Sequence, residues 1–495
     1  MPPITYHAYK HPGDHRDYAD KPVWNWHDVL IDAAEAAMSG HPEKFHLGQF
    51  VPIGAFNDPP FRKHLISFTR GMMIEVELPY DDKMRTDVLE DVYSPVWVAE
   101  CIHMVGYYVL ARWIGDLHGH LFWVHSANAH VHPVGYSEAN APSGYTIAPP
   151  HHIYKVARRR GARWLQEQLG CVLHRYTPLD EFDIKVGEIE RNKFKVNNRV
   201  ETPHDDDSFV LQPAIVKKVI GRRVLLEYSK SDIDSADLLN IDNMWRDMND
   251  PLIYPVGFAE SVDLPLQATG KYKAHVAAID KALKEKVKPG DLPYTRHDVK
   301  PETIDQGKTH LNVRMPWEAG MVCEMHDRLD KFQYALKPAR VLKVLPNGYL
   351  QVGPEGSDII NDSLYVHQTS TLLFPCGFAK KHQIPLQGLK DEPQFIWDSF
   401  LTAHPAYKMA PDHFFHQASE FDNPFKVGMR LEAIDQNEKL LCPATVRAIK
   451  GRLVQISFDG WAEDCDHLYD YRSNELFPCG WGEMVGHALQ RPDKV

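Results

Sequence analysis

Alternating apolar and polar side chains predict short β-strands near the C-terminal end of this chain. The segment 452–458 alternates with a period of two, which is typical of a half-buried strand. An apolar segment over 444–449 precedes it, and Lys450-Gly451 between the two predicts a tight turn. A less regular alternation over 429–434 predicts a first strand. Short strands joined by tight turns favour a small, curled antiparallel barrel.

A closing turn of the form Pro-x-Gly-aromatic occurs four times along the chain. It begins at residues 133, 255, 375 and 478, so that successive turns are 122, 120 and 103 residues apart. A period of this length indicates tandem repeats, each one a structural unit. Glycines upstream of the turns are expected to open the first strand of each unit: Gly71, Gly187, Gly320 and Gly428. We therefore predict four units, over 21–148, 149–268, 269–388 and 389–495.

Each unit is expected to begin with a helical segment and to end with strands. Apolar residues three and four apart predict helices over 24–38, 153–169, 272–287 and 395–401. The prolines and charges of 288–306 predict a long loop. The predicted fold is therefore mainly β with helical arms.

Length, charge and cysteine content narrow the class of protein. A chain of 495 residues is too long for a single hydrophobic core. The net charge of −12 argues against general binding to a phosphate backbone and suits a basic partner. Seven cysteines without a Cys-x-x-Cys pair indicate reduced thiols in the cytosol or nucleus. The polar N-terminal segment is not expected to be a signal peptide, and no apolar run has the length of a membrane helix.

Three motifs of the last unit occur in the order found in a known repeat. They read KVGMRLEAID at 426–435, ISFDGW at 456–461 and PCGW at 478–481. With these motifs the segment resembles the malignant-brain-tumour (MBT) repeat, a Tudor-related module that reads methylated lysine. The resemblance implies four tandem MBT repeats, each a small Tudor/SH3-like β-barrel with an extended helical arm packed on a neighbouring repeat. It also implies a nuclear, chromatin-associated, Polycomb-group-like protein that acts in transcriptional repression. The fourth unit is closest to the family, and the first three diverge from it.

The resemblance further implies a methyl-lysine pocket in the fourth unit. Asp435 matches the family's pocket aspartate, and Phe458 and Trp461 match two of the aromatic residues around it. Aromatic faces attract a methylated ammonium, and a carboxylate accepts the N–H that mono- and dimethyl-lysine retain. Lower methylation states should therefore be favoured. Asn437 and Leu440 follow the aspartate and are expected to line the pocket wall.

One position of this pocket departs from the family. Cys465 stands where the family has a third aromatic residue, and a thiol has no aromatic face. His467 and Tyr469 are the candidates to take over that role. The surrounding loop is acidic, which suits a basic peptide; its acidic residues are Asp459, Glu463, Asp464 and Asp466.

The same positions in the other three units do not form a complete set. The position of the pocket aspartate carries, in chain order, Leu78, Phe194 and Asp327. The aromatic positions carry Trp113, Asp116 and His120 in the first unit, Tyr228 in the second and no aromatic residue in the third. These units are therefore expected to serve as scaffold.

Other chemistry is weaker in the sequence. His118 and His120 would share one face of a strand, as two metal ligands can, but no further pair completes a tetrahedral set. Neither a metal nor a cofactor is therefore expected. The basic run 158–160 is expected to be a solvated helix face, so that nucleic acid would bind weakly at most. The sequence contains no Gly-x-Ser-x-Gly, His-Glu-x-x-His or phosphate-loop motif, and an enzyme is not expected.

Two functions stay open on the sequence alone. The first is recognition of methylated histone tail peptides by the fourth unit, with proteins of a repressor complex as further partners. The second is an adaptor whose degenerate repeats bind protein partners by their surfaces without recognising methyl-lysine. A membrane partner is not expected under either.

Overall fold

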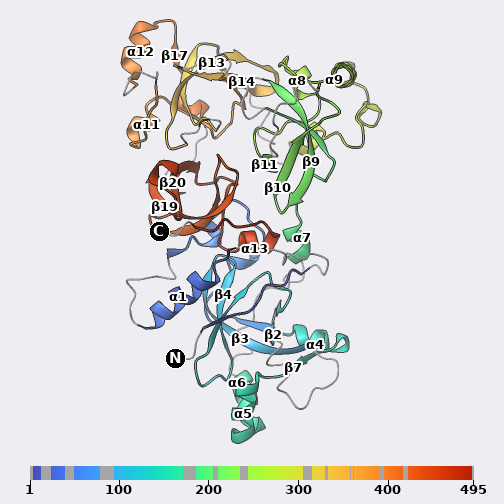
Figure 1. The fold of residues 1–495 in the computed structure, drawn as a ribbon, viewed down its shortest axis with the longest axis vertical. Coiled ribbons are helices and arrows are strands. Elements are labelled where there is room, and N and C mark those ends of the chain that lie inside the picture. Colours follow the sequence, from blue (N-terminus) through green and yellow to red (C-terminus); the bar gives the residue numbers. More distant parts are fainter. Residues whose placement is uncertain are drawn as a thin grey trace.

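The computed structural model describes residues 4–12, 24–39, 49–78, 94–170, 185–203, 210–234, 244–304, 315–328, 330, 333–356, 358–360, 362–388, 395–415 and 422–492. Within these residues the chain forms four β-sheets, one in each predicted unit (Figure 1). Their order in space differs from their order in the sequence. The fourth sheet, drawn in red, lies between the first sheet and the pair formed by the second and third.

The strands of each sheet follow one plan, in which four consecutive strands are joined in an antiparallel ladder. The first sheet contains β1 (Thr5–Tyr6), β2 (Met73–Glu77), β3 (Ser94–Val105), β4 (Tyr108–Trp113), β5 (Leu121–His125), β6 (Val131–His132) and β7 (Tyr145–Ile147), in the order β1-β5-β4-β3-β2-β6 with β7 paired to β3. The second contains β8 (Arg199–Pro203), β9 (Leu211–Ile220), β10 (Arg223–Tyr228) and β11 (Met244–Asp247), in the order β11-β10-β9-β8.

The third sheet contains β12 (Met321–Met325), β13 (Lys337–Val344), β14 (Tyr349–Pro354), β15 (Leu364–His367), β16 (Leu373–Phe374) and β17 (Lys408–Met409), in the order β15-β14-β13-β12-β16 with β17 paired to β12. The fourth contains β18 (Arg430–Ile434), β19 (Leu441–Lys450), β20 (Leu453–Phe458), β21 (His467–Asp470) and β22 (Leu476–Phe477), in the order β21-β20-β19-β18-β22. The three strands predicted for this unit are confirmed.

The helices are short except in the arms. The arm helices are α1 (His27–Met38), α5 (His151–Arg160), α6 (Ala162–Gly170), α9 (Gly270–Lys284) and α12 (Trp397–Ala403). The shorter ones are α2 (Arg62–Leu65), α4 (Tyr136–Ala139), α7 (Lys185–Ile189), α8 (Phe258–Ser261), α10 (Pro301–Ile304), α11 (Phe378–Lys381) and α13 (Trp481–Val485). The helices predicted over 24–38, 272–287 and 395–401 are confirmed with small changes of bounds. None of the described helices is long and apolar enough to cross a membrane.

One irregularity of strand pairing recurs in every barrel. The register between the second and third strands of the ladder shifts once in each sheet, where the second strand has an extra residue after Cys101, Val216, Val341 and Val446. A bulge of this kind bends its strand and increases the local twist. The repeated bulge is one reason why these small sheets curl over a single apolar core.

A buried glutamate joins the first strand of each barrel to its Pro-x-Gly turn. The glycine of the turn has φ between 87° and 94°, a conformation that would strain any side chain. The short helix that follows begins with N–H groups that have no partner within the helix. Two of these N–H groups donate to the two carboxylate oxygens of the glutamate at 2.6–2.8 Å. The four glutamates are Glu75, Glu201, Glu324 and Glu432.

The residue that opens each first strand also has a left-handed backbone. Its N–H donates to a carbonyl of the second strand at 2.8 Å in all four barrels. These residues are Gly71, Asn197, Gly320 and Gly428, with φ between 70° and 89°. The prediction that Gly187 opens the second barrel is therefore wrong, because Gly187 lies in α7. Asparagine is one of the few residues other than glycine that adopt this conformation readily, so a search for glycine misses it.

Three of the helical arms pack on the barrel of another repeat in the same way. A backbone N–H of the arm donates to the first strand of that barrel: Val51 to Arg430 at 3.0 Å, Val299 to Arg199 at 2.9 Å and Ala410 to Val322 at 3.0 Å. An aromatic residue of the same arm donates to the buried glutamate: Trp26 to Glu432 at 2.9 Å, Tyr272 to Glu201 at 3.1 Å and Trp397 to Glu324 at 2.9 Å. The first arm thus covers the fourth barrel, the third arm the second, and the fourth arm the third. The predicted fold, small barrels with helical arms packed on other repeats, is confirmed.

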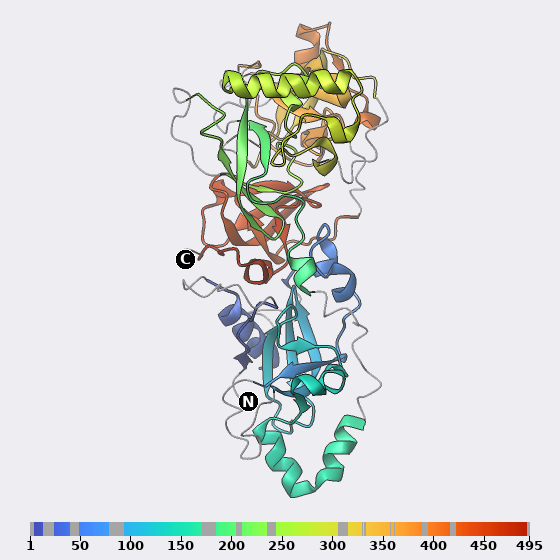
Figure 2. The same ribbon diagram turned by 90° about the vertical axis from the view of Figure 1, so that its right-hand side faces the viewer.

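The arm of the second unit differs from the single helix predicted over 153–169. Helix α5 ends at Arg160 and is followed by Gly161, whose φ is 93°; α6 then turns away, so that the two helices form a V (Figure 2). Ile153 and Trp164 pack against the loop after β4, where each would stand 3.4 Å from a Cβ added to Gly115. This arm therefore covers the first barrel. The boundaries of the four units stay a prediction.

Candidate functional site

The loop between β18 and β19 holds Asp435 at one end of the fourth barrel. The ladder ends at the pair Ile434 and Leu441, and the Asp435 N–H closes the loop on the Leu440 carbonyl at 2.8 Å. The carboxylate accepts the backbone N–H groups of Asn437 at 3.1 Å and Glu438 at 2.8 Å, one on each oxygen. Only 1% of Asp435 is exposed. Burial raises the pKa of this carboxyl, and the two N–H donors oppose the shift only in part.

Phe458 and Trp461 lie on either side of the turn that follows β20. Phe458 ends the strand opposite Ala444, and the Trp461 N–H donates to the Phe458 carbonyl at 3.0 Å. Gly460, with φ 86°, makes this sharp turn possible. The two ring centroids are 5.5 Å apart with the planes inclined by 51°. Phe458 is buried, whereas Trp461 is partly exposed.

His467 connects the carboxylate to these aromatic rings. Its Nε2 lies 3.4 Å from Asp435 Oδ1, and its ring stands edge-on to Phe458 at a centroid distance of 5.1 Å. The Gln436 N–H donates to its Nδ1 at 3.3 Å. Burial lowers the pKa of His467 to about 3, so that the imidazole is neutral at physiological pH. Asp435, His467, Phe458 and Trp461 therefore form one continuous group of side chains.

The remaining predicted pocket residues lie at the edge of this group. Cys465 ends the single-turn helix Glu463–Cys465, and its Sγ lies 3.8 Å from Asp464 Oδ1. Asn437 and Leu440 are exposed on the β18–β19 loop. Tyr469, the other candidate for the role of the third aromatic residue, is buried and donates its hydroxyl to the Ile434 carbonyl.

Arginines bind most of the acidic side chains near the Phe458–Trp461 turn. Asp459 accepts hydrogen bonds from Arg430 at 2.7 Å and Thr445 at 2.9 Å. Arg447 pairs with Glu463 and, at 3.3 Å, with Asp466. The acidic character of this loop is therefore balanced in part within the barrel.

The strand register shows what the other barrels carry at the position of Phe458. Trp113, Tyr228 and Pro354 stand opposite an alanine of the neighbouring strand, as Phe458 does. In the third barrel the carboxylate of Asp327 pairs with Lys337 at 2.9 Å. The prediction of Phe194 at the aspartate position of the second barrel is wrong, because counting from Asn197 places that position at residue 204, outside the described residues.

Comparisons with known proteins agree with this architecture. The model of the mbt repeat matches residues 198–273, 321–392 and 429–495. Protein lin-61 of Caenorhabditis elegans is 30% identical over 468 residues, which cover 90% of this chain and 74% of lin-61. Polycomb protein Sfmbt of Drosophila melanogaster is 31% identical over 469 residues, which cover 90% of this chain and 35% of Sfmbt. The chain thus spans about a third of the length of Sfmbt.

A solved structure extends the likeness to three dimensions. The four MBT repeats of Drosophila melanogaster Sfmbt, in complex with the peptide RHR(me)KVLR, superpose with a TM-score of 0.76 and 25% sequence identity. The match covers 95% of this chain and 99% of that one. The family model matches the second, third and fourth repeats, and the first barrel has the same design. Lin-61 also aligns over most of both chains. The chain belongs to the family of MBT-repeat proteins and is similar to the Polycomb protein Sfmbt.

Proposed function

We propose that the fourth repeat binds methylated lysine, with a preference for the lower methylation states. The observation that carries this proposal is the group formed by a buried carboxylate and three neighbouring rings. Asp435 accepts two backbone N–H groups and lies 3.4 Å from an imidazole that is neutral at physiological pH. A neutral ring leaves the negative charge of the aspartate available to a cationic ligand.

The aromatic rings suit the methyl groups of such a ligand. A methylated ammonium is less strongly hydrated than a free one, and each aromatic face contributes about 0.5–2 kcal/mol to binding a cation. Trp461 is partly exposed beside the buried Phe458 and His467, so we place the entrance of the pocket at Trp461. Asn437, Leu440 and Cys465 would surround that entrance.

The relatives support the same function and a chromatin context. The solved four-repeat unit of Sfmbt holds a methyl-lysine peptide that also contains three arginines and a histidine. A basic peptide also suits the net charge of −12 of this chain. We therefore propose a nuclear protein that binds methylated histone tails and acts in repression, together with proteins of a repressor complex.

Calorimetric titration with the peptide RHRKVLR, carrying an un-, mono-, di- or trimethylated lysine, tests the proposal. A single weak site near 100 μM corresponds to roughly −5.5 kcal/mol. Removing one ring by Trp461→Ala should weaken binding of the methylated peptides by about 2- to 30-fold, since one cation–π contact is lost.

Trp245→Ala serves as the matched control, because Trp245 is also partly exposed but lies on β11 of the second barrel. It should leave peptide affinity unchanged. Equal affinity for unmodified and methylated peptides would refute methyl-lysine recognition and favour an adaptor that binds partners by its surface.

Restoring an aromatic residue at position 465 should improve the pocket. Cys465 is partly exposed on a single-turn helix, so a larger side chain has access to solvent. Cys465→Tyr is expected to tighten binding of the methylated peptides by about 2- to 30-fold, the value of one added cation–π contact. The same titration measures it, with Cys465→Ser as the control of similar size. Unchanged binding by the tyrosine variant would show that residue 465 does not face the ligand.

A further inference from the structure

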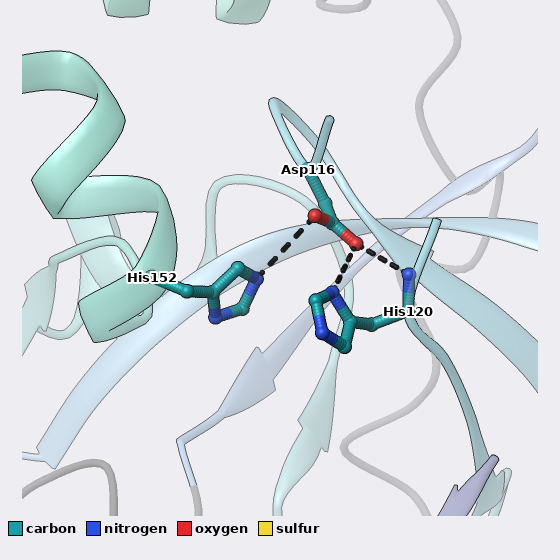
Figure 3. Close-up of side chains that lie close together, drawn as sticks. All are labelled: Asp116, His120 and His152. Carbon is teal, nitrogen blue, oxygen red and sulfur yellow. Dashed lines mark hydrogen bonds and ion pairs between the residues drawn. The ribbon is translucent and has the colours of Figure 1, made fainter. Parts of the chain in front are cut away.

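A second cluster of chemically active side chains lies in the first repeat. Asp116 and His120 belong to the loop between β4 and β5, and His152 comes from the first turn of α5 (Figure 3). The sequence predicts His118 and His120 on one face of a strand. That prediction is wrong, because both residues lie in the loop. The second histidine of the cluster is His152, which lies on a helix 32 residues further along the chain.

The three side chains direct ligand atoms toward one another. His120 Nδ1 lies 3.0 Å from Asp116 Oδ2, and His152 Nε2 lies 3.7 Å from Asp116 Oδ1. All three ligand atoms lie within 4.8 Å of one another. Bonds of about 2.0–2.1 Å to a tetrahedral zinc ion place two of its ligand atoms roughly 3.3 Å apart. The two distances, each from a different oxygen of Asp116, lie on either side of that value, and side-chain rotation would bring the three ligand atoms to one ion.

The backbone holds the carboxylate in place for this role. The side chain of Asp116 is fully buried, and its oxygens accept the N–H groups of His118 at 2.9 Å and His120 at 2.6 Å. Hydrogen bonds of this kind orient a ligand carboxylate and favour its charged form. The two imidazoles keep 39% and 31% of their side-chain surface exposed, which leaves an approach for an ion and for a solvent ligand.

We propose that Asp116, His120 and His152 bind a zinc ion that joins the arm of the second repeat to the barrel of the first. Two imidazoles and one carboxylate are typical of Zn²⁺, whereas Mg²⁺ and Ca²⁺ prefer oxygen ligands alone. The ion would connect two elements that already pack together, since Ile153 and Trp164 of this arm contact the same loop at Gly115. The fourth coordination position would hold water.

The cluster occupies the positions of the first barrel that correspond to the proposed lysine pocket of the fourth. Asp116 stands three residues after Trp113, as Trp461 does after Phe458, and His120 stands seven residues after, as Cys465 does. The end of the barrel that carries the proposed lysine pocket in the fourth repeat thus carries metal ligands in the first. The zinc site is independent of the proposed function of the fourth repeat.

Competition between the full chain and a chromophoric chelator for Zn²⁺ tests the proposal. The wild-type protein should bind one equivalent of Zn²⁺ at this site, more tightly than any Zn²⁺ held by its other histidines. His120→Asn and His152→Gln should each lower the affinity for this Zn²⁺ ion. Loss of a residue that only hydrogen-bonds a metal ligand costs roughly 10- to 100-fold in affinity, and loss of a ligand itself should cost more. Both replacements keep a polar side chain of similar length beside Asp116. His404→Asn, which changes an exposed histidine on the fourth arm, should have no effect.

Two further readouts separate a metal site from a simple hydrogen-bonded triad. Co²⁺ bound by the wild-type protein should show visible absorption of a low-symmetry site, and both triad variants should lose it. Zn²⁺ should slow hydrogen exchange in α5 of the wild-type protein alone. Zinc binding of equal strength in the wild type and the His152→Gln variant would overturn the proposal. The absence of a saturable equivalent in the wild type would do the same, and metal-free thermal unfolding of each variant confirms that the comparison is between folded proteins.

Discussion

Replacing Trp26 with alanine is expected to destabilise the protein by about 3–5 kcal/mol, the usual cost of removing a buried tryptophan. Trp26 is fully buried between the first and fourth repeats, and its indole N–H donates to Glu432 at 2.9 Å. Its ring also packs on Phe50 at 5.9 Å and beneath the guanidinium of Arg430 at 5.3 Å. The variant loses all of these contacts at once.

The lost hydrogen bond adds to this effect because the glutamate stays buried. Burial raises the pKa of Glu432 to about 7, although the N–H groups of Gly482, Gly480 and Trp26 oppose the shift. Glu432 Oε1 then keeps the Gly480 N–H and loses the indole N–H, and losing a hydrogen bond to a buried carboxyl costs about 1–3 kcal/mol. Trp26→Phe should cost less than Trp26→Ala, since it keeps an aromatic ring in most of the space while it removes the N–H.

Denaturant unfolding followed by far-ultraviolet circular dichroism measures both variants. Several repeats need not unfold in one step, so the midpoint of the first transition is the quantity to compare. Trp24→Ala is the matched control, because Trp24 is a partly exposed neighbour whose ring centroid lies 5.1 Å from that of Trp26. An unchanged midpoint for Trp26→Ala would contradict the packing of the first arm on the fourth barrel.

Replacing Asp435 with asparagine is expected to weaken binding of mono- and dimethylated peptides by about 10- to 150-fold. This range corresponds to the roughly 1.5–3 kcal/mol of a hydrogen bond to a charged group. Trimethyl-lysine has no N–H to donate, so its binding should fall by less. The variant should therefore lose the difference between methylation states as well as affinity. Titration with the four RHRKVLR peptides measures both quantities.

The third repeat supplies a matched control for this substitution. Asp327 lies seven residues after Gly320, as Asp435 does after Gly428, but Asp327 pairs with Lys337 at 2.9 Å. A carboxylate already neutralised by a lysine has little to offer a second cation. Asp327→Asn should leave peptide binding unchanged. If Asp435→Asn retained its preference for lower methylation states, the carboxylate could not be the group that accepts the lysine N–H.

The sequence supports the repeat number and the barrel because both are encoded locally. Alternation over 452–458 reports which side chains face a core, and β20 spans Leu453–Phe458 accordingly. The four Pro-x-Gly turns report a backbone that only glycine adopts without strain, and all four have φ near 90°. The second repeat shows the limit of this reasoning. Asn197 adopts the conformation expected of glycine, so the search for a glycine selected Gly187 in α7 as the opening residue.

Some residues of the candidate site can also be predicted from the sequence, whereas others depend on the fold. A family resemblance identifies Asp435, Phe458 and Trp461, since each lies within a short, unbroken motif of the sequence. The contacts of His467 with both Asp435 and Phe458 depend on how β21 returns beside β20, and the sequence offered Tyr469 as an equal candidate. Strand alternation cannot distinguish the two, because residues two apart lie on the same face.

Contacts between distant segments are what only the folded chain reveals. Trp26 and Glu432 are 406 residues apart, yet they form the hydrogen bond that places the first arm on the fourth barrel. His152 meets Asp116 for a similar reason, because α5 packs against the loop after β4. Periodicity and turn residues determine local backbone conformation and which faces are buried. The pairing of an arm with a barrel depends on the shapes of surfaces that exist only once the repeats have folded. No local sequence pattern encodes that pairing.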